Sequence, residues 1–313
     1  MTLLVQLVDT KEYVESNCFQ HQLLHTLKSV CLEEGYTFMQ CELKEILRGG
    51  TCPKEAGVIS CLKQRSIFNN IDGIARWLDT TPVVIYDQDP WQSYMDDSPY
   101  KGAYDLMFKK LNVKTFALTT QWWVDFLKER GLPSSFAKMG VLPEYCSEGV
   151  PYVDRKAVAG FVGTVHSRRQ ELLDVIERSG IKTSVLRSNS LSYEKFLRLI
   201  ACMRIFVHNE TMPILVDGKE LDFGTGMWVK DIEAVSQGCF SIRGKGEGSE
   251  TYLQNVQTVF LYDTLDQVPE IIRHIEALEP EARQNMINHD VSYVRSANVW
   301  KKTAQQLVAL SAR

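Results

Sequence analysis

Short apolar runs alternate along this chain with longer segments whose apolar residues recur at helical spacing. In the first half the short runs are rich in β-branched and aromatic residues, which predicts strands. The segments between them repeat their apolar positions every three or four residues, as amphipathic helices do. The predicted strands of this half are 3–8, 36–42, 57–61, 82–86, 115–119 and 136–141, and the clearest helices are 19–34, 67–78 and 121–130.

The alternation stops at residues 143–151, which contain two prolines and a glycine and predict a linker. It then resumes, and strands that alternate with single helices form parallel βαβ units. We therefore predict an α/β chain of two Rossmann-like domains, at 1–150 and 151–313, whose last helix is able to pack back on the first domain. The second half has predicted strands at 158–162, 183–187, 205–208, 239–242 and 259–262, and helices at 169–178, 193–202, 227–237, 265–277, 280–289 and 291–310.

Two such domains predict where a ligand binds. In parallel α/β sheets ligands lie outside the carboxyl ends of the strands, where the strand order reverses. When two domains face each other, their crevices form one cleft. The architecture therefore suggests a nucleotide-type ligand between the domains, without specifying a reaction.

Composition narrows the class of protein. The chain has 313 residues, 44% of them hydrophobic, with a net charge of −4. Such a length favours two domains, and the acidic balance makes nucleic acid an unexpected partner. The eight cysteines form no CxxC pair and are expected to be buried, reduced thiols. Without a leader pattern or an apolar run long enough to span a bilayer, the protein is expected to be cytoplasmic.

The first chemical motif runs from a predicted strand into a helix. Gly163 ends the strand, where a glycine lets the backbone approach a ligand, and Thr164 and His166 follow it. The helix that begins next offers free N–H groups and a positive dipole to a phosphate. Arg168 and Arg169 would add charge-assisted hydrogen bonds. The alternative is a strand–turn–helix whose basic first turn is merely solvated.

The second motif precedes the helix at 227–237. Gly224 and Gly226 bracket Thr225, which makes a second anion site at a helix N-terminus. On the helix, Lys230 and Glu233 are three residues apart and share a face. The alternative is an ordinary amphipathic helix that ends in a glycine cap.

With these motifs in place, the second half resembles the CgeB-like, spore maturation protein-like branch of the group 1 glycosyltransferases, which have the GT-B fold. The Phe-Val-Gly at 161–163 with Arg-Arg at 168–169 is similar to the start of that family's C-terminal domain. Ile-Glu-Ala-Val-Ser-Gln-Gly at 232–238, Gly-Ser-Glu-Thr-Tyr-Leu at 248–253 and His-Asp-Val-Ser-Tyr-Val-Arg at 289–295 resemble its later elements in the same order. The resemblance covers about residues 157–310.

The resemblance implies a donor site for a nucleotide-sugar. Glu233 would hydrogen-bond the ribose hydroxyls, the two glycine loops would hold the diphosphate and sugar, and Lys230 or an arginine would offset charge on the leaving nucleoside diphosphate without a metal. A UDP-sugar is favoured over a GDP-sugar, and no cofactor is expected. The implied donor residues are Gly163, Thr164, His166, Arg168, Arg169, Arg187, Gly224, Thr225, Gly226, Lys230 and Glu233.

One position departs from the family pattern. Many group 1 retaining enzymes carry a second glutamate eight residues before the one at 233, and here that position is Thr225. The departure leaves both the donor sugar and the retaining or inverting course open.

The first half offers candidates for the acceptor side. Asp87 and Asp89 follow an apolar strand and would accept a proton from an acceptor hydroxyl. Trp91 would stack on a sugar ring, and Asp9 ends the first strand. The alternative is an Asp-Pro turn beside a buried tryptophan.

The sequence thus predicts a metal-independent glycosyltransferase that moves a sugar from a nucleoside-diphosphate sugar to an acceptor hydroxyl of a glycan or small molecule. One alternative is a degenerate GT-B module that binds a nucleotide-sugar or glycan without turnover. Another is a non-hydrolysing sugar-nucleotide epimerase, which would need no acceptor. A dehydrogenase is disfavoured because no G-x-G-x-x-G follows the first strand.

Overall fold

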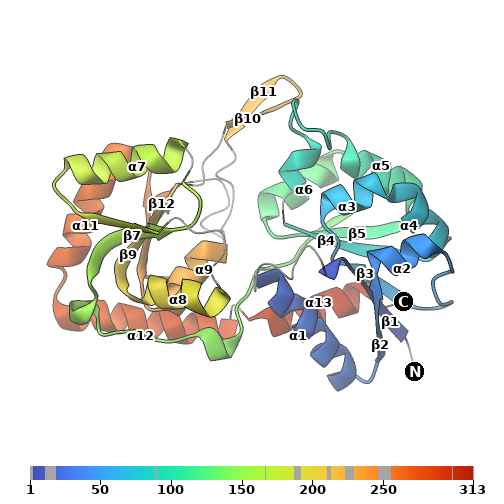
Figure 1. The fold of residues 1–313 in the computed structure, drawn as a ribbon, viewed down its shortest axis with the longest axis horizontal. Coiled ribbons are helices and arrows are strands. Elements are labelled where there is room, and N and C mark those ends of the chain that lie inside the picture. The colour runs from blue at the N-terminus through green and yellow to red at the C-terminus, as the bar shows by residue number, and fades with distance from the viewer. Residues whose placement is uncertain are drawn as a thin grey trace.

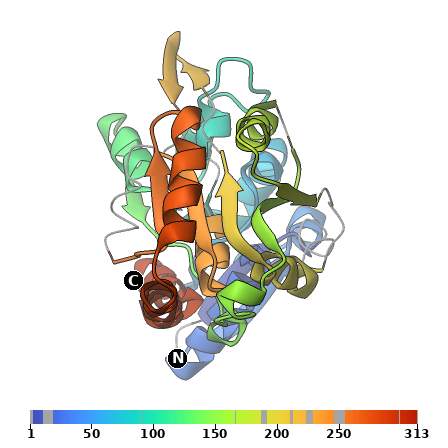
Figure 2. The same ribbon diagram turned by 90° about the vertical axis from the view of Figure 1, so that its left-hand side faces the viewer.

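Each half of the chain is built around its own parallel sheet, and the two halves lie side by side (Figure 1). The computed structural model describes residues 3–10, 19–88, 90–165, 167–186, 192–209, 213–222, 229–245, 255–297 and 299–312. Figure 2 views the molecule from the outer side of the second half.

The first sheet has the order β2-β1-β3-β4-β5-β6, and each strand pairs in parallel with its neighbours. Its strands are β1 (Leu3–Val8), β2 (Thr37–Glu42), β3 (Gly57–Ser60), β4 (Val83–Asp87), β5 (Val113–Leu118) and β6 (Ser134–Phe136). The order reverses between β1 and β3, so the switch point of this sheet lies at the carboxyl ends of those two strands.

Helices cover both faces of the first sheet because its strands are apolar on both sides. In β1, Leu4 and Val8 point into the core under α1, whereas Val5 and Leu7 point into the core on the opposite face. That opposite face is covered by α2 (Leu43–Arg48), α3 (Gln64–Asn69), α4 (Ile71–Leu78), α5 (Ala103–Lys110) and α6 (Gln121–Glu129). The first face is covered by α1 (Phe19–Glu33) and α13 (Trp300–Ser311).

The second sheet has the order β13-β12-β9-β7-β8, again parallel throughout. The order reverses between β7 and β9, which places its switch point at their carboxyl ends. The strands are β7 (Ala157–Val162), β8 (Thr183–Leu186), β9 (Met203–His208), β12 (Phe240–Gly244) and β13 (Val259–Tyr262). The helices are α7 (Ser167–Arg178), α8 (Tyr193–Ala201), α9 (Val229–Ser236), α11 (Val268–Ala277, after the 3₁₀ turn η5, Leu265–Gln267) and α12 (Pro280–Ala297).

The segment between the sheets contains two 3₁₀ turns, η3 (Pro143–Tyr145) and η4 (Tyr152–Asp154), and is fixed to the end of α9. The buried guanidinium of Arg155 donates to the carbonyls of Glu148, Val150 and Met203. The amide of Ser147 donates to the carbonyl of Ser236 at 2.7 Å. This segment is therefore held at both ends by hydrogen bonds.

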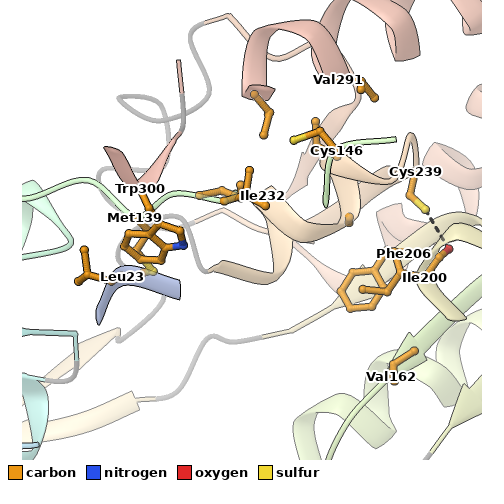
Figure 3. Close-up of a cluster of buried hydrophobic side chains, with 14 of the residues drawn as sticks. Leu23, Met139, Cys146, Val162, Ile200, Phe206, Ile232, Cys239, Val291 and Trp300 are labelled. Atoms are coloured by element: carbon orange, nitrogen blue, oxygen red, sulfur yellow. Dashed lines mark hydrogen bonds between the residues drawn. The ribbon is translucent and has the colours of Figure 1, made fainter. Parts of the chain in front are cut away.

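The end of the chain returns to the first half, where α13 packs against α1. This return requires a close backbone approach at Gly140, because a Cβ there would stand 2.5 Å from the amide nitrogen of Trp300. Figure 3 shows Trp300 beside Met139 and Leu23, within one buried cluster that continues into the second half. In that half, the thiol of Cys239 donates to the carbonyl of Ile200 at 3.1 Å.

A hairpin of β10 (Pro213–Val216) and β11 (Lys219–Asp222) leaves the second half and touches the first (Figure 1). The amide of Asp96 donates to the carbonyl of Leu215 at 3.0 Å, and Val216 is buried in the core of the first half. Arg130 pairs with Asp217 at 3.2 Å. The hairpin therefore adds contacts between the halves to those of the shared buried cluster.

Several predicted elements differ from the structure. Residues 136–141 are not one strand: β6 ends at Phe136, and the next residues leave the sheet because Lys138 and Val141 accept hydrogen bonds from Thr303 and Trp300 of α13. The predicted helix at 67–78 is two helices, because the side chain of Asn70 bonds the carbonyl of Ser66 and turns the chain.

The final helices also divide at another place than expected. The prediction ends one helix at 289 and begins the next at 291, but Asp290 lies inside α12. Its buried carboxylate accepts hydrogen bonds from the backbone amides of Gln257 and Thr258. The elements α2, α5 and the β10–β11 hairpin were not predicted. The seven described cysteines are all free thiols: Cys31, Cys41, Cys52, Cys61, Cys146, Cys202 and Cys239.

Candidate functional site

The switch point of the second sheet contains the first predicted motif. Gly163 follows β7 directly, and His208 ends the neighbouring strand β9. Gly163 has φ +137°, a conformation that favours glycine, and its amide donates to the carbonyl of Leu186 at 3.0 Å. The hydrogen bond to Leu186 therefore fixes the turn that follows β7. This turn lies at the carboxyl edge of the sheet, where α/β proteins bind their ligands.

Two cationic side chains gather around the aromatic ring beside Gly163. The guanidinium of Arg169 lies 4.8 Å from the centre of the Phe161 ring and donates to the carbonyl of Thr164. The ammonium of Lys230, which comes from α9, lies 5.0 Å from the same centre. Arg169 is buried and fixes the loop after Gly163, whereas Lys230 is half-buried and brings positive charge to that loop.

Glu233 lies one turn after Lys230 on α9, with only 3% of its surface exposed. Burial raises the pKa of this carboxyl to about 7, although a hydrogen bond from Tyr193 and the charge of Lys230 both act to lower it. Tyr193 begins α8, where Ser192 is the N-cap and accepts the amide of Lys195. The predicted pair of Lys230 and Glu233 is thus present on one side of α9, with Tyr193 as a partner that the sequence did not reveal.

Behind the switch point lies a buried network of charged groups. The carboxylate of Asp231 accepts hydrogen bonds from Nε2 of His208 at 2.6 Å and from the guanidinium of Arg243 at 2.8 Å. The hydroxyl of Ser241 donates a third hydrogen bond to it at 3.0 Å. Burial alone would raise the pKa of Asp231, but the charges of His208 and Arg243 and the hydrogen bonds lower it to about 2. The network ties α9 to the carboxyl ends of β9 and β12, which fixes the position of Lys230.

The first half has a small, open pocket at the carboxyl ends of β3 and β4, beside the switch point of its sheet. Asp87 is in its wall: one carboxylate oxygen accepts the Tyr104 hydroxyl at 2.8 Å and the other accepts the amide of Gln88 at 2.7 Å. The pocket is apolar on the α1 side and polar on the β4 side. Its lining residues are Leu23, Leu24, Cys61, Leu62, Lys63, Tyr86, Asp87 and Gln88.

The other two acceptor candidates lie outside that lining. Asp9 follows β1 and is half-exposed, next to Thr10, whose hydroxyl and amide both donate to Glu42. Trp91, in the 3₁₀ turn η2 (Pro90–Ser93), packs against the core of the first half. Their roles toward an acceptor stay predictions, as do the ligand contacts of Arg168, which is half-buried at the start of α7.

Several predicted residues lie outside the part of the chain that the structure describes. This set includes one of the two proposed bases and most of the second glycine motif. Its members are Asp89, His166, Arg187, Gly224, Thr225 and Gly226.

Two signals in the sequence pointed to residues that the prediction missed. An arginine inside an apolar strand, as at Arg243, requires a buried partner, and Asp231 is one of the two acidic residues on the helix that precedes it. Tyr193 gave no such signal because a tyrosine at a helix start is ordinary. Its role depends on which helix packs beside it.

The described residues contain no group of three or more His, Cys, Asp or Glu side chains placed to hold a metal ion. None of the described helices has the length and apolar character needed to cross a membrane.

Comparison with known proteins finds likeness in structure alone. No protein-family model matches the chain, and no curated protein matches it in sequence. Among solved structures, HepE of Anabaena in complex with UDP and glucose has a TM-score of 0.63 at 10% identity, over 99% of both chains. The sucrose-phosphate synthase of Thermosynechococcus elongatus has a TM-score of 0.64 at 10% identity, over 99% of this chain and 98% of that one. A glycosyltransferase of Rickettsia africae has a TM-score of 0.60 at 12% identity, over 99% and 97%.

These likenesses establish the fold. The chain has the GT-B fold, with two Rossmann-like domains that face each other, as the sequence predicted. They share the GT-B fold that the family resemblance implies and do not address its CgeB-like branch. The boundary between the domains at residue 150 likewise stays a prediction.

Proposed function

We propose that the protein is a glycosyltransferase that moves a sugar from a nucleoside-diphosphate sugar to an acceptor hydroxyl. One observation carries the proposal. Helix α9 carries an ammonium group, Lys230, next to the glycine that ends β7 at the switch point of a Rossmann-like sheet, and a buried carboxyl, Glu233, one turn further along the helix. A nucleoside diphosphate needs both groups, because it presents anionic phosphates and neutral ribose hydroxyls a few ångströms apart.

In this proposal the ribose hydroxyls donate to the carboxylate of Glu233. Burial makes that carboxyl costly to ionise, as its pKa of about 7 shows, so hydrogen bonds from a ligand would offset part of this cost. The diphosphate lies over the backbone of Gly163, close to the Lys230 ammonium. Positive charge fixed at this place stabilises the negative charge that develops on the leaving nucleoside diphosphate.

The acceptor enters from the first half, at the pocket that Asp87 lines. Each oxygen of the Asp87 carboxylate accepts one hydrogen bond, which holds the group in a fixed orientation. An acceptor hydroxyl placed in this pocket would lie within reach of a carboxylate able to receive its proton. Asp89, two residues later, is the second candidate for this role.

Solved structures with the same fold support a uracil nucleotide as the donor. The HepE structures similar to this chain contain UDP with glucose, UDP-glucose, or UDP alone. We propose a UDP-sugar as the donor and no metal requirement, since Lys230 is placed to provide the charge that a metal would otherwise supply. Membership of the CgeB-like branch of the group 1 glycosyltransferases is the finer form of this proposal.

The test measures release of nucleoside diphosphate from UDP-, GDP-, ADP- and dTDP-sugars, with and without a panel of glycan and small-molecule acceptors and with EDTA. A transferase releases UDP in proportion to acceptor, and EDTA leaves the rate unchanged. Conversion of the nucleotide-sugar without any acceptor would instead indicate an epimerase. Binding of UDP without turnover on any acceptor would favour a binding module.

A further inference from the structure

A hairpin that leaves the second half docks its tip on the first half. Among the described strands, β10 and β11 pair only with each other, in antiparallel register, and the two-residue loop Asp217-Gly218 joins them. Both loop residues have positive φ, at +51° and +72°, as the type I′ turn of a tight hairpin requires. The tip is therefore preformed, and little of its conformational freedom is lost when it docks.

The contacts of the tip centre on Val216. This residue is 3% exposed within the core cluster of the first half and forms an antiparallel bridge with Met95, whereas Leu215 beside it is 54% exposed. Asp96 binds the tip on either side: its amide donates to the carbonyl of Leu215 at 3.0 Å, and its carboxylate accepts the amide of Gly218 at 3.1 Å. A buried apolar side chain and two hydrogen bonds thus fix the hairpin tip to the other half.

The first half provides a seat for the tip that its own residues orient. The carboxylate of Asp96 also pairs with Lys101, close to it along the chain. The guanidinium of Arg130 lies 3.5 Å from the centre of the Phe126 ring and pairs with Asp217 of the tip at 3.2 Å. Because Lys101 and Phe126 belong to the first half, the charged groups of the seat keep their positions when the hairpin leaves.

Along the chain, the hairpin lies between elements of the candidate donor site, and its seat follows the candidate base. It follows β9, which ends at His208, and precedes α9, which carries Lys230. Its seat at Asp96 comes after β4, which ends at Asp87. Figures 1 and 2 both place the hairpin at the top of the molecule, and α12 and α13, which return the chain to the first half, toward the bottom. The halves are therefore joined at two opposite places.

We propose that the β10–β11 hairpin is a clasp, whose docking at Met95 and Asp96 holds the two halves at one separation and whose release lets them move apart about the crossing into α13. Trp300, at the start of α13, is fully buried, and its amide donates to the carbonyl of Val141, so this crossing stays fixed. The clasp is the weaker connection, because its few contacts are far less than the interface that a stable association needs. Neither its contacts nor its test involves a ligand, so the clasp stands or falls independently of the proposed function.

The test compares the full-length wild type with Val216→Asp and with Leu215→Asp as the matched control. Aspartate at position 216 would place an unpaired charge in an apolar core and release the tip, whereas the same change at the exposed Leu215 leaves the charge in water. Hydrogen exchange of the Asp96 amide, followed by NMR, reports docking, and small-angle X-ray scattering reports the separation of the halves. We expect Val216→Asp to speed this exchange at least about 10-fold and to enlarge the radius of gyration. Leu215→Asp should match wild type in both.

A second variant, Gly218→Pro, alters only the exposed turn, because proline cannot adopt φ +72° and has no amide for Asp96 to accept. It should give the same two changes without touching either core, so the test stands even if Val216→Asp fails to fold. If either variant is folded by circular dichroism and keeps the wild-type exchange rate and radius of gyration, the clasp is overturned. Faster exchange at Asp96 with an unchanged radius of gyration would overturn its role in holding the halves together.

Discussion

The ammonium of Lys230 lies 5.0 Å from the centre of the Phe161 ring and would lie 3.5 Å from a Cβ placed on Gly163. Lys230 comes from α9, whereas Phe161 and Gly163 belong to the end of β7. The pair therefore joins the two elements that flank the switch point of the second sheet. Bound phosphate groups would lie over the backbone at Gly163, next to the Lys230 ammonium.

Replacing Lys230 by methionine should weaken UDP binding while leaving uridine binding nearly unchanged, because the ammonium contacts phosphate. Loss of a charge-assisted hydrogen bond predicts a Kd for UDP higher by roughly 10- to 100-fold. Isothermal titration of both ligands measures the difference. The exposed Lys128 provides the matched control, Lys128→Met. An equal loss for uridine and UDP would show that Lys230 does not act through the phosphates.

Replacing Gly163 by alanine should cost both stability and binding, and a second glycine separates the two effects. Gly163 and Gly180 both have positive φ, at +137° and +83°, so alanine strains either backbone by about 1 kcal/mol. Only at Gly163 does the added Cβ approach the Lys230 ammonium. We expect both variants to melt earlier, as calorimetry would show, but only Gly163→Ala to lose affinity for UDP. Equal UDP affinities for Gly163→Ala and Gly180→Ala would show that the Gly163 loop does not bind the phosphates.

Asp231→Asn should destabilise the fold strongly, because it leaves the Arg243 guanidinium, 2% exposed, without its carboxylate partner. Breaking a buried ion pair typically costs about 3 to 5 kcal/mol. The carboxyl has a pKa of about 2, below its usual 3.8. It therefore contributes stability above pH 3.8, and this contribution is lost as the pH falls toward 2.

Urea unfolding at several pH values checks the Asp231 prediction. Wild type should lose stability as the pH falls below about 4, and Asp231→Asn should show less of this loss. Asp96→Asn is the control, since its carboxylate pairs with Lys101 in an exposed position and should change the melting temperature little. A stable Asp231→Asn protein would mean that the network does not hold α9 in place.

Val216→Ala should weaken the connection between the two halves. Val216 is 3% exposed in the core of the first half, whereas its neighbour Leu215 is 54% exposed. Removing two buried methyl groups predicts a loss of about 2 kcal/mol, and Leu215→Ala should cost little. Thermal unfolding compares the two. If both variants melt like wild type, the hairpin contributes nothing to holding the halves together.

The sequence predicted the fold well where one rule decides the structure. Alternation of apolar strands with amphipathic helices located ten of the strands approximately, because each buried strand must be apolar on both faces. It failed at residues 137–141, whose apolar side chains are just as buried but lie against α13, far along the chain. It failed also at Asp290, a polar residue inside a helix whose carboxylate accepts a hydrogen bond from the backbone amide of Thr258 in a neighbouring loop. In both places a tertiary contact decides.

The candidate site was predictable to a similar extent. Gly163, Lys230 and Glu233 were selected because a glycine after a strand and charges three residues apart on a helix are local patterns, and their contacts with a ligand stay predictions. Tyr193 was missed because its place beside Glu233 depends on how α8 packs against α9, which no local pattern encodes. Asp231 was not predicted because Lys230 and Glu233 lie close to it on the same helix, so its charge alone did not distinguish it.

The central claim is that Glu233 binds the nucleotide, and the most direct measurement is the Kd of UDP at pH 8 for wild type and Glu233→Ala. At this pH the carboxyl, with a pKa of about 7, is mostly ionised. Loss of its hydrogen bonds to the ribose predicts a Kd at least about 10-fold higher, while the exposed Glu171→Ala control should bind UDP like wild type. A folded Glu233→Ala protein that binds UDP as tightly as wild type would contradict the account.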